Sequence, residues 1–335
     1  MSEEFDQIVQ RRNKLSMIRE SGNPFPNDFR RTAFAGDLQS QYADTGFSED
    51  QDPVRVRVSG RLMSRRLMGK ASFTHIQDTT GQIQLFLQKN QLGEAGYEQF
   101  RNYDIGDIVG AEGELFRTRT GELSVRVEQI RLLTKALRPL PEKFHGLTDP
   151  ETRYRQRYLD LIMNEGTRSV FHTRAAIIQH IREFMISHRY LEVETPMMHP
   201  IPGGAVARPF ITHHNALDMD LYLRVAPELY LKKLVVGGFE RVFEINRNFR
   251  NEGMSTRHNP EFTMMEFYCA FADYNDFIAL TQELVKSLCE SVVGSEQLTY
   301  QGQEIDFSGS FERYDMIESI LKFNPDISHN MLHNE

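Results

Sequence analysis

The stretch VFEINRNFRNEGMSTRHNPEFTMMEFYC, residues 242–269, predicts two antiparallel strands, 242–252 and 260–269, joined by a short loop. Successive side chains of a strand point to opposite faces of a sheet. In the first strand this alternation places Phe243, Ile245 and Phe249 on a core face and leaves the other face almost wholly polar. In the second strand the residues that share a face are Phe262, Met264, Glu266 and Tyr268. The hairpin therefore predicts a sheet that presents polar side chains beside a hydrophobic core.

The loop and its flanks hold the residues best suited to chemistry. Arg250 offers a planar fork of N–H donors that matches a phosphate or a carboxylate, and it lies on the polar face beside Glu252. A purely structural Arg–Glu pair on an exposed strand is the alternative interpretation. The sequence contains no zinc-protease, serine-hydrolase, Rossmann or P-loop motif, so any nucleotide has to be bound by other means.

Upstream of this hairpin the pattern predicts helices and a small barrel. Apolar spacing predicts helices over Phe5–Glu20 and Thr167–His188, and a strand over Tyr190–Thr195 that Pro196 ends. Short alternating runs between the helices predict five strands, for which an oligonucleotide-binding barrel (OB-fold) is the best fit. These runs are 54–58, 72–76, 82–87, 108–113 and 123–127.

The predicted fold class is α+β, with an N-terminal five-stranded OB-fold β-barrel followed by an antiparallel sheet flanked by helices. Pro139 and Pro141 interrupt regular structure, so a domain boundary is expected close to them. The expected segments are an N-terminal helical arm, the barrel, a linker and a second domain. Their bounds are 1–53, 54–137, 138–160 and 161–335.

The composition is that of an ordinary globular protein of 335 residues, with 39 basic and 47 acidic side chains and a net charge of −8. This acidic balance argues against non-specific coating of nucleic acid, yet the run Arg55–Lys70 holds six basic side chains and no acidic one. Neither a signal peptide nor an apolar run of membrane-spanning length is found, so a cytoplasmic protein without membrane contact is expected. Cys269 and Cys289 are expected to be buried thiols.

Two segments resemble the motifs of a known enzyme class. Phe249–Glu252, the loop residues Arg257–His258, and then Phe262 and Glu266 resemble motif two of the class II aminoacyl-tRNA synthetases. Arg189–Pro196 resembles motif one, whose proline ends a strand at the dimer interface. Together with a preceding anticodon-binding barrel, this is the arrangement of subclass IIb, the lysine, aspartate and asparagine enzymes.

Within that subclass, Val225–Lys232 and Arg153–Asp160 are similar to the bacterial lysyl-tRNA synthetases. The resemblance implies a lysine–tRNA ligase, a homodimer through motif one, which activates lysine with ATP and Mg²⁺ to lysyl-adenylate and transfers it to tRNA(Lys). It also places a Gly-rich third motif and the metal ligands downstream of Glu335, so the class II catalytic domain is expected to be incomplete and the metal ligands are unknown.

The resemblance also implies site residues. The catalytic residues would be Arg250, which neutralises charge at the ATP α-phosphate and the amino-acid carboxylate, and Glu252, which helps to hold the nucleotide. ATP would be bound by Arg250, Glu252, His258, Asn259 and Phe262, the last by stacking on adenine. Lysine would be bound by Gly204, Glu228, Arg250, Glu266 and Tyr268. The tRNA anticodon would be bound by Arg66, Phe73 and Gln84.

Two other functions stay open. The first is a catalytically incomplete fragment or paralogue that acts as a tRNA-binding protein. For the 335-residue chain itself the missing motif implies salt-sensitive tRNA binding without lysine-dependent pyrophosphate exchange. The second is a ligase for aspartate or asparagine. Those substrates need a basic or amide partner, whereas Glu266 with Tyr268 suits a cation.

Overall fold

The computed structural model describes residues 3–43, 52–141 and 147–332. The chain divides into two units, Met1–Asn164 and Glu165–Glu335, which are described separately below. Each unit has a hydrophobic cluster of its own. The three boundaries between the four segments expected from the sequence stay predictions, and part of the expected linker, 142–146, lies outside the described residues.

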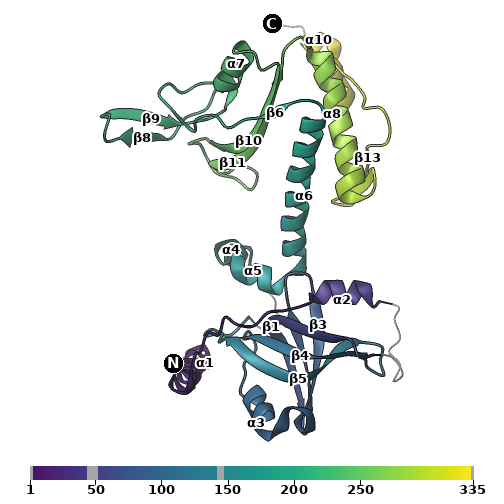
Figure 1. Cartoon of the computed structure of the whole chain (residues 1–335). Coiled ribbons are helices and arrows are strands. Elements are labelled where there is room, and N and C mark those ends of the chain that lie inside the picture. The colour runs from purple at the N-terminus through teal and green to yellow at the C-terminus, as the bar shows by residue number, and fades with distance from the viewer. Residues whose placement is uncertain (1–2, 44–51, 142–146, 333–335) are drawn as a thin grey trace. The chain divides into compact units, whose positions relative to one another are not determined.

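Five strands of the first unit close into a barrel with the order β1-β2-β3-β5-β4 (Figure 1). All neighbours are antiparallel except β3 and β5, and the pairing of β1 with β4 closes the ring. The predicted five-stranded OB-fold barrel is thereby confirmed. The strands are β1 (Arg55–Met68), β2 (Ala71–Gln77), β3 (Gln82–Gln88), β4 (Ile108–Arg117) and β5 (Leu123–Thr134).

Strand β1 is much longer than the predicted run 54–58. Its first half, Arg55–Arg61, pairs with β4, and its second half, Arg61–Met68, pairs with β2. The register shifts between Leu62 and Ser64, which is a β-bulge that bends the strand from one partner to the other. The extension therefore depends on strand pairing rather than on local alternation.

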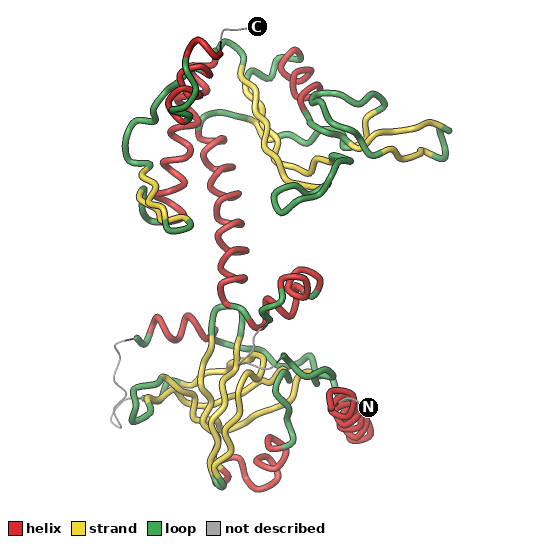
Figure 2. Tube along the Cα trace, turned by 180° about the vertical axis from the view of Figure 1, so that it is seen from behind, coloured by secondary structure: helices red, strands yellow, loops and turns green. Residues whose placement is uncertain are grey.

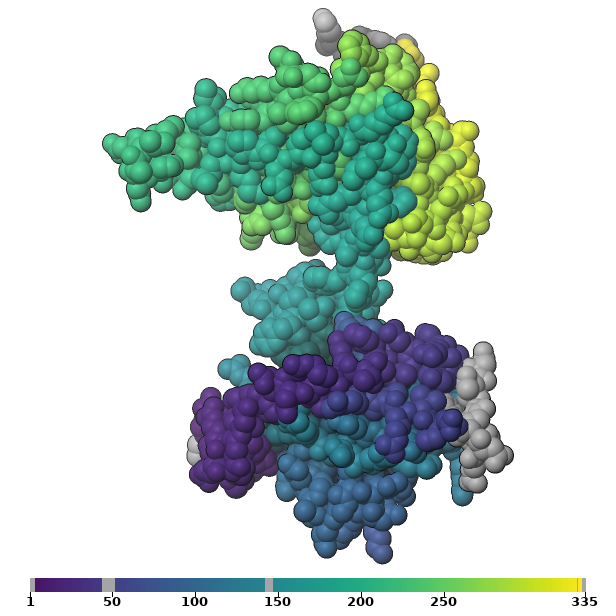
Figure 3. Space-filling model, in the orientation of Figure 1, coloured from purple at the N-terminus to yellow at the C-terminus, as the bar shows by residue number. Residues whose placement is uncertain are grey.

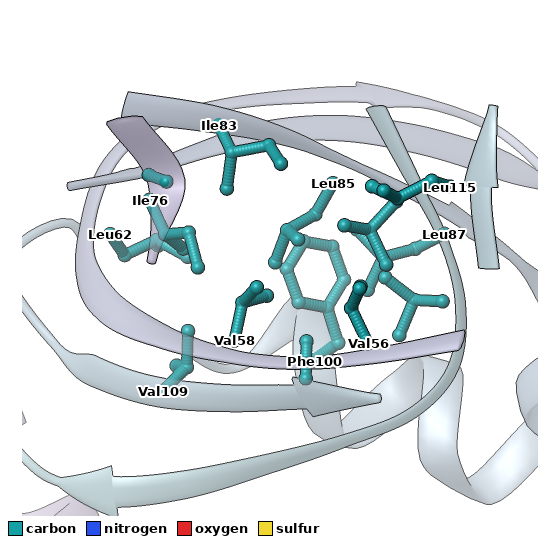
Figure 4. Close-up of a cluster of buried hydrophobic side chains, with 14 of the residues drawn as sticks. Val56, Val58, Leu62, Ile76, Ile83, Leu85, Leu87, Phe100, Val109 and Leu115 are labelled. Atoms are coloured by element: carbon teal, nitrogen blue, oxygen red, sulfur yellow. The ribbon is translucent and has the colours of Figure 1, made fainter. Parts of the chain in front are cut away.

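The barrel interior is filled by the inward-facing residue of each alternating pair (Figure 4). Leu62, Ile83 and Leu85 are at most 1% exposed. One end of this core is completed by Phe100 of helix α3 (Lys89–Arg101), which is fully buried. The sequence did not predict α3, which contains a non-helical residue, Gly93, with φ of 73°.

The N-terminal segment lies over the barrel (Figure 3). Helix α1 (Glu3–Ser21), which was predicted, is tied down by Arg11. The Arg11 guanidinium donates to the carbonyls of Ile105, Ala136 and Arg138 at 3.1, 3.2 and 3.2 Å. Three shorter helices complete the described part of this unit. They are α2 (Ala35–Gln41), α4 (Pro150–Arg155) and α5 (Arg157–Met163).

The second unit is built on the predicted hairpin. Strands β10 (Arg241–Phe249) and β11 (Glu261–Cys269) are antiparallel, and the short β6 (Leu191–Glu192) joins β10 in parallel. The strand expected over Tyr190–Thr195 shrinks to β6, because only Val242 and Phe243 pair with it. The sheet packs against α6 (Glu165–Ser187) and α8 (Tyr274–Leu288), red in Figure 2. The predicted α+β class is confirmed.

The remaining elements of the second unit are shorter. A three-stranded sheet has the order β7-β9-β8, and a separate hairpin pairs β12 with β13. None of the helices in the described part of the chain is both long and apolar enough to cross a membrane. The elements are β7 (Met198–His199), β8 (Ile211–His214), β9 (Met219–Leu223), α7 (Glu228–Val236), the π-helix η1 (Cys289–Val293), β12 (Gln297–Tyr300), β13 (Gln303–Asp306), α9 (Met316–Phe323) and α10 (His329–Leu332).

Candidate functional site

The polar face of the β10–β11 hairpin gathers several of the expected site residues. Cross-strand partners in an antiparallel sheet share a face. The register pairs Glu244 with Glu266 and Asn248 with Phe262, and it places Tyr268 opposite Val242. The structure thus brings Phe262, Glu266 and Tyr268 to one face, as alternation predicted. This face is covered rather than solvated, since Glu244 is 1% exposed and Asn248 is fully buried.

Glu244 of this face belongs to an ion pair that the sequence did not predict. Arg224 and Glu244 are 2.7 Å apart, and their side chains are 0% and 1% exposed. Thr195 Oγ1 donates to Glu244 Oε2 at 2.6 Å, and Arg224 Nε donates to the Arg247 carbonyl at 3.0 Å. The pair therefore joins the segment that precedes Pro196 to β10, the strand that carries Glu244.

Glu266 and Tyr268 form a direct hydrogen bond, in which the phenol donates to Glu266 Oε2 at 3.0 Å. Burial raises the pKa of Glu266, and the charges of Glu228 and Glu244 raise it further, whereas the bond from Tyr268 and the charge of Arg224 act the other way. Burial, followed by the charge of Glu266, also raises the pKa of Tyr268. The site is thus negatively charged and partly desolvated, which suits a cation.

Gly204 and Glu228 lie together at the start of α7. A Cβ atom on Gly204 would lie 3.1 Å from the Glu228 Cβ and 3.2 Å from the Ala226 Cβ, and the φ of Gly204 is +92°. Both the close approach and the left-handed backbone require glycine here. The Glu228 carboxylate accepts from Lys232 Nζ at 2.6 Å. This exposed amine is the kind of partner that another cation can displace.

The residues expected to bind the nucleotide divide into two groups. Arg250 and Phe262 are in contact, with the guanidinium carbon 5.2 Å from the ring centroid, and the buried Arg250 Nε has no hydrogen-bond partner among the described residues. Glu252, His258 and Asn259 are exposed in the loop. The Glu252 carboxylate accepts from the Arg208 backbone at 3.3 Å, which ties this loop to the segment before β8.

A second candidate site lies on the barrel, in a pocket of about 600 Å³ that we call the barrel pocket. It brings together Arg66, Phe73 and Gln84, which the sequence had singled out. The Phe73 ring is stacked on Phe86, with centroids 4.8 Å apart. The barrel pocket is lined by Ser64, Arg65, Arg66, Phe73, His75, Gln84, Thr118, Arg119, Thr120 and Glu122. A flat aromatic ring flanked by cations and polar groups is suited to an unstacked base.

Glu122 is one of the residues of this pocket that sequence reasoning missed. Its carboxylate accepts from Gln84 Nε2 at 2.7 Å, and Gln84 Oε1 accepts from Ser124 Oγ at 2.9 Å. Glu122 lies in the turn before β5, where the motif Thr-Gly-Glu gives only a turn signal.

A larger cavity of about 730 Å³ lies between α1 and the barrel and contains none of the expected site residues. Its cations Lys14, Arg131 and Lys135 are paired with aspartates.

Neither site holds an evident metal centre. Within the described residues there is no group of three or more His, Cys, Asp or Glu side chains arranged to hold a metal ion. Each nearby carboxylate already has a partner: Glu228 pairs with Lys232, Glu244 pairs with Arg224, and Glu266 accepts a hydrogen bond from Tyr268. The residues present therefore do not fit a bound divalent cation.

Comparisons with known proteins agree with this geometry. Residues 149–333 match the family described as tRNA synthetases class II (D, K and N), and residues 56–133 match the OB-fold nucleic acid binding domain. The chain is 61% identical to the lysine–tRNA ligase of Thioalkalivibrio sulfidiphilus over 97% of its own length and 66% of the relative. The corresponding proteins of Idiomarina loihiensis and Legionella pneumophila are each 60% identical, over 96% and 95% of this chain and 65% and 64% of the relatives. The chain thus spans slightly less than two thirds of these relatives.

Proposed function

The chain belongs to the class II (D, K and N) family of tRNA synthetases, and we propose that the protein to which it belongs is a lysine–tRNA ligase. Such an enzyme activates lysine with ATP to lysyl-adenylate and transfers the lysyl group to tRNA(Lys). The observation that carries the choice of lysine is the hydrogen-bonded pair Glu266–Tyr268 in a partly desolvated, negatively charged site. The relatives that carry the same name support it.

The amino-acid pocket is assigned by charge. Glu266 and Tyr268 hold the side-chain ammonium of lysine, because a desolvated cation needs a carboxylate and a further polar partner. Glu228 holds the α-amino group, in exchange for its exposed partner Lys232. The absence of a side chain on Gly204 leaves room beside Glu228. A substrate carboxylate in place of the ammonium would be repelled by the carboxylate of Glu266, which disfavours aspartate, and the uncharged amide of asparagine would leave that buried charge unbalanced.

Adenylate formation needs little covalent help from the protein. The lysine carboxylate attacks the α-phosphorus, pyrophosphate leaves, and negative charge builds on the α-phosphate oxygens. Arg250 neutralises this charge with its fork of donors. Its Nε has no hydrogen-bond partner among the described residues, so no bond within the protein has to be broken for it to donate to the phosphate. Phe262 stacks on the adenine, while Glu252, His258 and Asn259 hold the nucleotide from the loop.

Magnesium enters this proposal only as part of the MgATP substrate. The described residues do not fit a resident ion, so no step is assigned to it. The remaining partners follow from the family. tRNA(Lys) binds through the barrel pocket, with Phe73 stacking on an anticodon base and Gln84 and Arg66 beside it. A cytoplasmic homodimer forms through motif one, where Leu191 is exposed by 47%, and just after this motif Met198 and Ile201 are exposed by 55% and 74%.

The alternative is a protein that binds tRNA through the barrel without activating lysine. The barrel pocket favours it as much as it favours the ligase, because it lies within the first unit. The amino-acid site distinguishes the two functions. A protein that only binds tRNA has no need for the carboxylates around Glu266.

The proposal is tested by amino-acid binding to the 335-residue chain. Isothermal titration calorimetry with lysine, norleucine, aspartate and asparagine should detect lysine alone, since norleucine has the same chain without the ammonium. Binding of aspartate or asparagine, or equal binding of lysine and norleucine, would refute the lysine assignment. Titration of the same protein with tRNA(Lys) at increasing salt should show affinity that falls as salt rises.

A further inference from the structure

The amino-acid site is in contact with a lysine of the protein itself. Lys232 extends from α7, and its Nζ lies 2.6 Å from Glu228 Oε1. The same nitrogen lies 5.8 Å from the centroid of the Tyr268 ring on β11. One ammonium group of the protein therefore interacts with residues that are proposed to hold the two ammonium groups of the substrate lysine.

The carboxylates of this site need a cation in the lysine-free protein. Burial is the first cause that raises the pKa of Glu266, and the charge of Glu228 is a further cause, so the two carboxylates repel each other. Lys232 offsets this repulsion, because its amine neutralises Glu228. When the substrate brings an α-amino group to Glu228, two cations compete for one carboxylate.

The Lys232–Glu228 pair is built so that it can be broken. The two residues are four positions apart on one helix, and their side chains are exposed by 56% and 30%. Pairs of this spacing and exposure are weak, and the Lys232 amine stays in water when it turns away. The contact with Tyr268, which lies on another element, distinguishes this pair from one that only stabilises a helix surface.

We propose that Lys232 is an internal counter-cation of the amino-acid site, which neutralises Glu228 in the lysine-free protein and is displaced by the α-amino group of the substrate. Lysine therefore binds in competition with Lys232, and this competition lowers its affinity. A ligand without an α-amino group leaves the Lys232–Glu228 pair intact and does not compete with it. The inference rests on the proposed lysine-binding function of the site.

The test is isothermal titration calorimetry of the 335-residue chain with lysine and with 6-aminohexanoate, which is lysine without its α-amino group. Lys232→Met should tighten lysine binding about two- to fivefold and change 6-aminohexanoate binding by less than about 1.5-fold. Lys232→Arg keeps the charge and should bind lysine no more tightly than the wild type. Lys233→Met is the matched control and should change neither affinity, because the Lys233 amine lies over the Tyr230 ring, 4.7 Å from its centroid.

Acetylation of the unsubstituted protein supplies a second readout, which holds even if Lys232→Met fails to fold. Brief treatment with acetic anhydride, followed by mass spectrometry, gives the modification of Lys232 relative to its neighbour Lys233. Saturating lysine should raise this ratio about twofold or more, because Lys232 loses the anion that stabilises its charged form, whereas 6-aminohexanoate should not.

Three outcomes would overturn this inference. They are a Lys232→Met variant that binds lysine no more tightly than the wild type, an equal gain in affinity for both ligands, and an acetylation ratio that does not respond to lysine. A wild type that binds neither ligand would overturn the proposed function, and this inference with it.

Discussion

Removal of the buried arginine beneath the amino-acid site, by Arg224→Met, should strongly destabilise the second unit. Glu244 would keep the hydrogen bonds from Thr195 Oγ1, Thr195 N and Asn246 Nδ2 but would lose Arg224, its charged partner 2.7 Å away. The carbonyls of Arg247 and Thr195 would lose a donor as well. Breaking a fully buried pair costs about 3–5 kcal/mol. We therefore expect the free energy of unfolding of this unit to fall by about 4 kcal/mol.

Thiol labelling measures this loss in the correct unit, because both cysteines of the chain, Cys269 and Cys289, belong to it and Cys289 is 6% exposed. When opening and closing are fast, the labelling rate of Cys289 follows the open population. The matched control is Arg247→Met on the same strand. The Arg247–Glu261 pair is 3.6 Å long and more than half exposed, so the control should cost less than about 1 kcal/mol.

The two variants should thus differ on the order of 100-fold in labelling rate. Restoring charge balance with the double variant Arg224→Met, Glu244→Gln should recover about 1–3 kcal/mol, since the orphaned carboxylate is removed. Equal labelling rates for Arg224→Met and Arg247→Met would refute the reasoning. So would a double variant that is less stable than the single one.

Three further outcomes are expected. Phe73→Ala should weaken tRNA(Lys) binding by about 1–3 kcal/mol without unfolding the barrel, and an unchanged affinity in a filter-binding assay would contradict the stacking role. Because the pKa of Glu266 is raised in the fold, its contribution to stability is present at low pH and is lost as pH rises through that pKa, so the free energy of unfolding of the lysine-free protein, measured by urea denaturation, should fall as pH rises. Glu266→Gln should flatten that fall and abolish lysine binding in calorimetry, and a pH dependence of the unfolding free energy that persists in this variant would assign it to another group. Gly204→Ala should weaken lysine binding, whereas the control Gly253→Ala should not, because a Cβ at position 253 meets nothing within 4 Å. Equal affinities of the two variants would show that the close approach of Gly204 to Glu228 has no role in lysine binding.

The sequence predicted the existence of the barrel strands better than their extent. Alternation is local, so all five strands were found, but where a strand ends depends on its partners. Leu62–Met68 continues β1 because β2 pairs with it across a bulge, and no local pattern announces that pairing. Helix α3 was missed because Gly93 and Gly96 are poor helix formers. The helix is stabilised by the packing of its Phe100 into the barrel core, which is a tertiary contact.

In the candidate site, too, features set by the local pattern were predictable and features set by tertiary packing were not. Phe262, Glu266 and Tyr268 share a face because a strand has a period of two residues, so their juxtaposition was predictable. The roles given to Gly204 and Glu228 came from resemblance, and the structure places the two residues side by side. Arg224 and Glu122 were not predicted, since each acts through a partner on another strand. Such pairings are set by tertiary packing, which a single sequence does not display.

The strand order of the barrel has a consequence for how the protein is made. Strand β5 inserts between β3 and β4, although both are synthesised before it. Until residues 123–134 leave the ribosome, β3 and β4 each keep an unpaired edge, and the interior that Leu85 and Val109 line stays open to water. The nascent chain therefore passes through a stage with two unpaired strand edges and an exposed apolar interior. Such surfaces promote aggregation and are commonly bound by chaperones. Synonymous codons that slow translation just before Leu123 would lengthen that exposure without altering the finished protein.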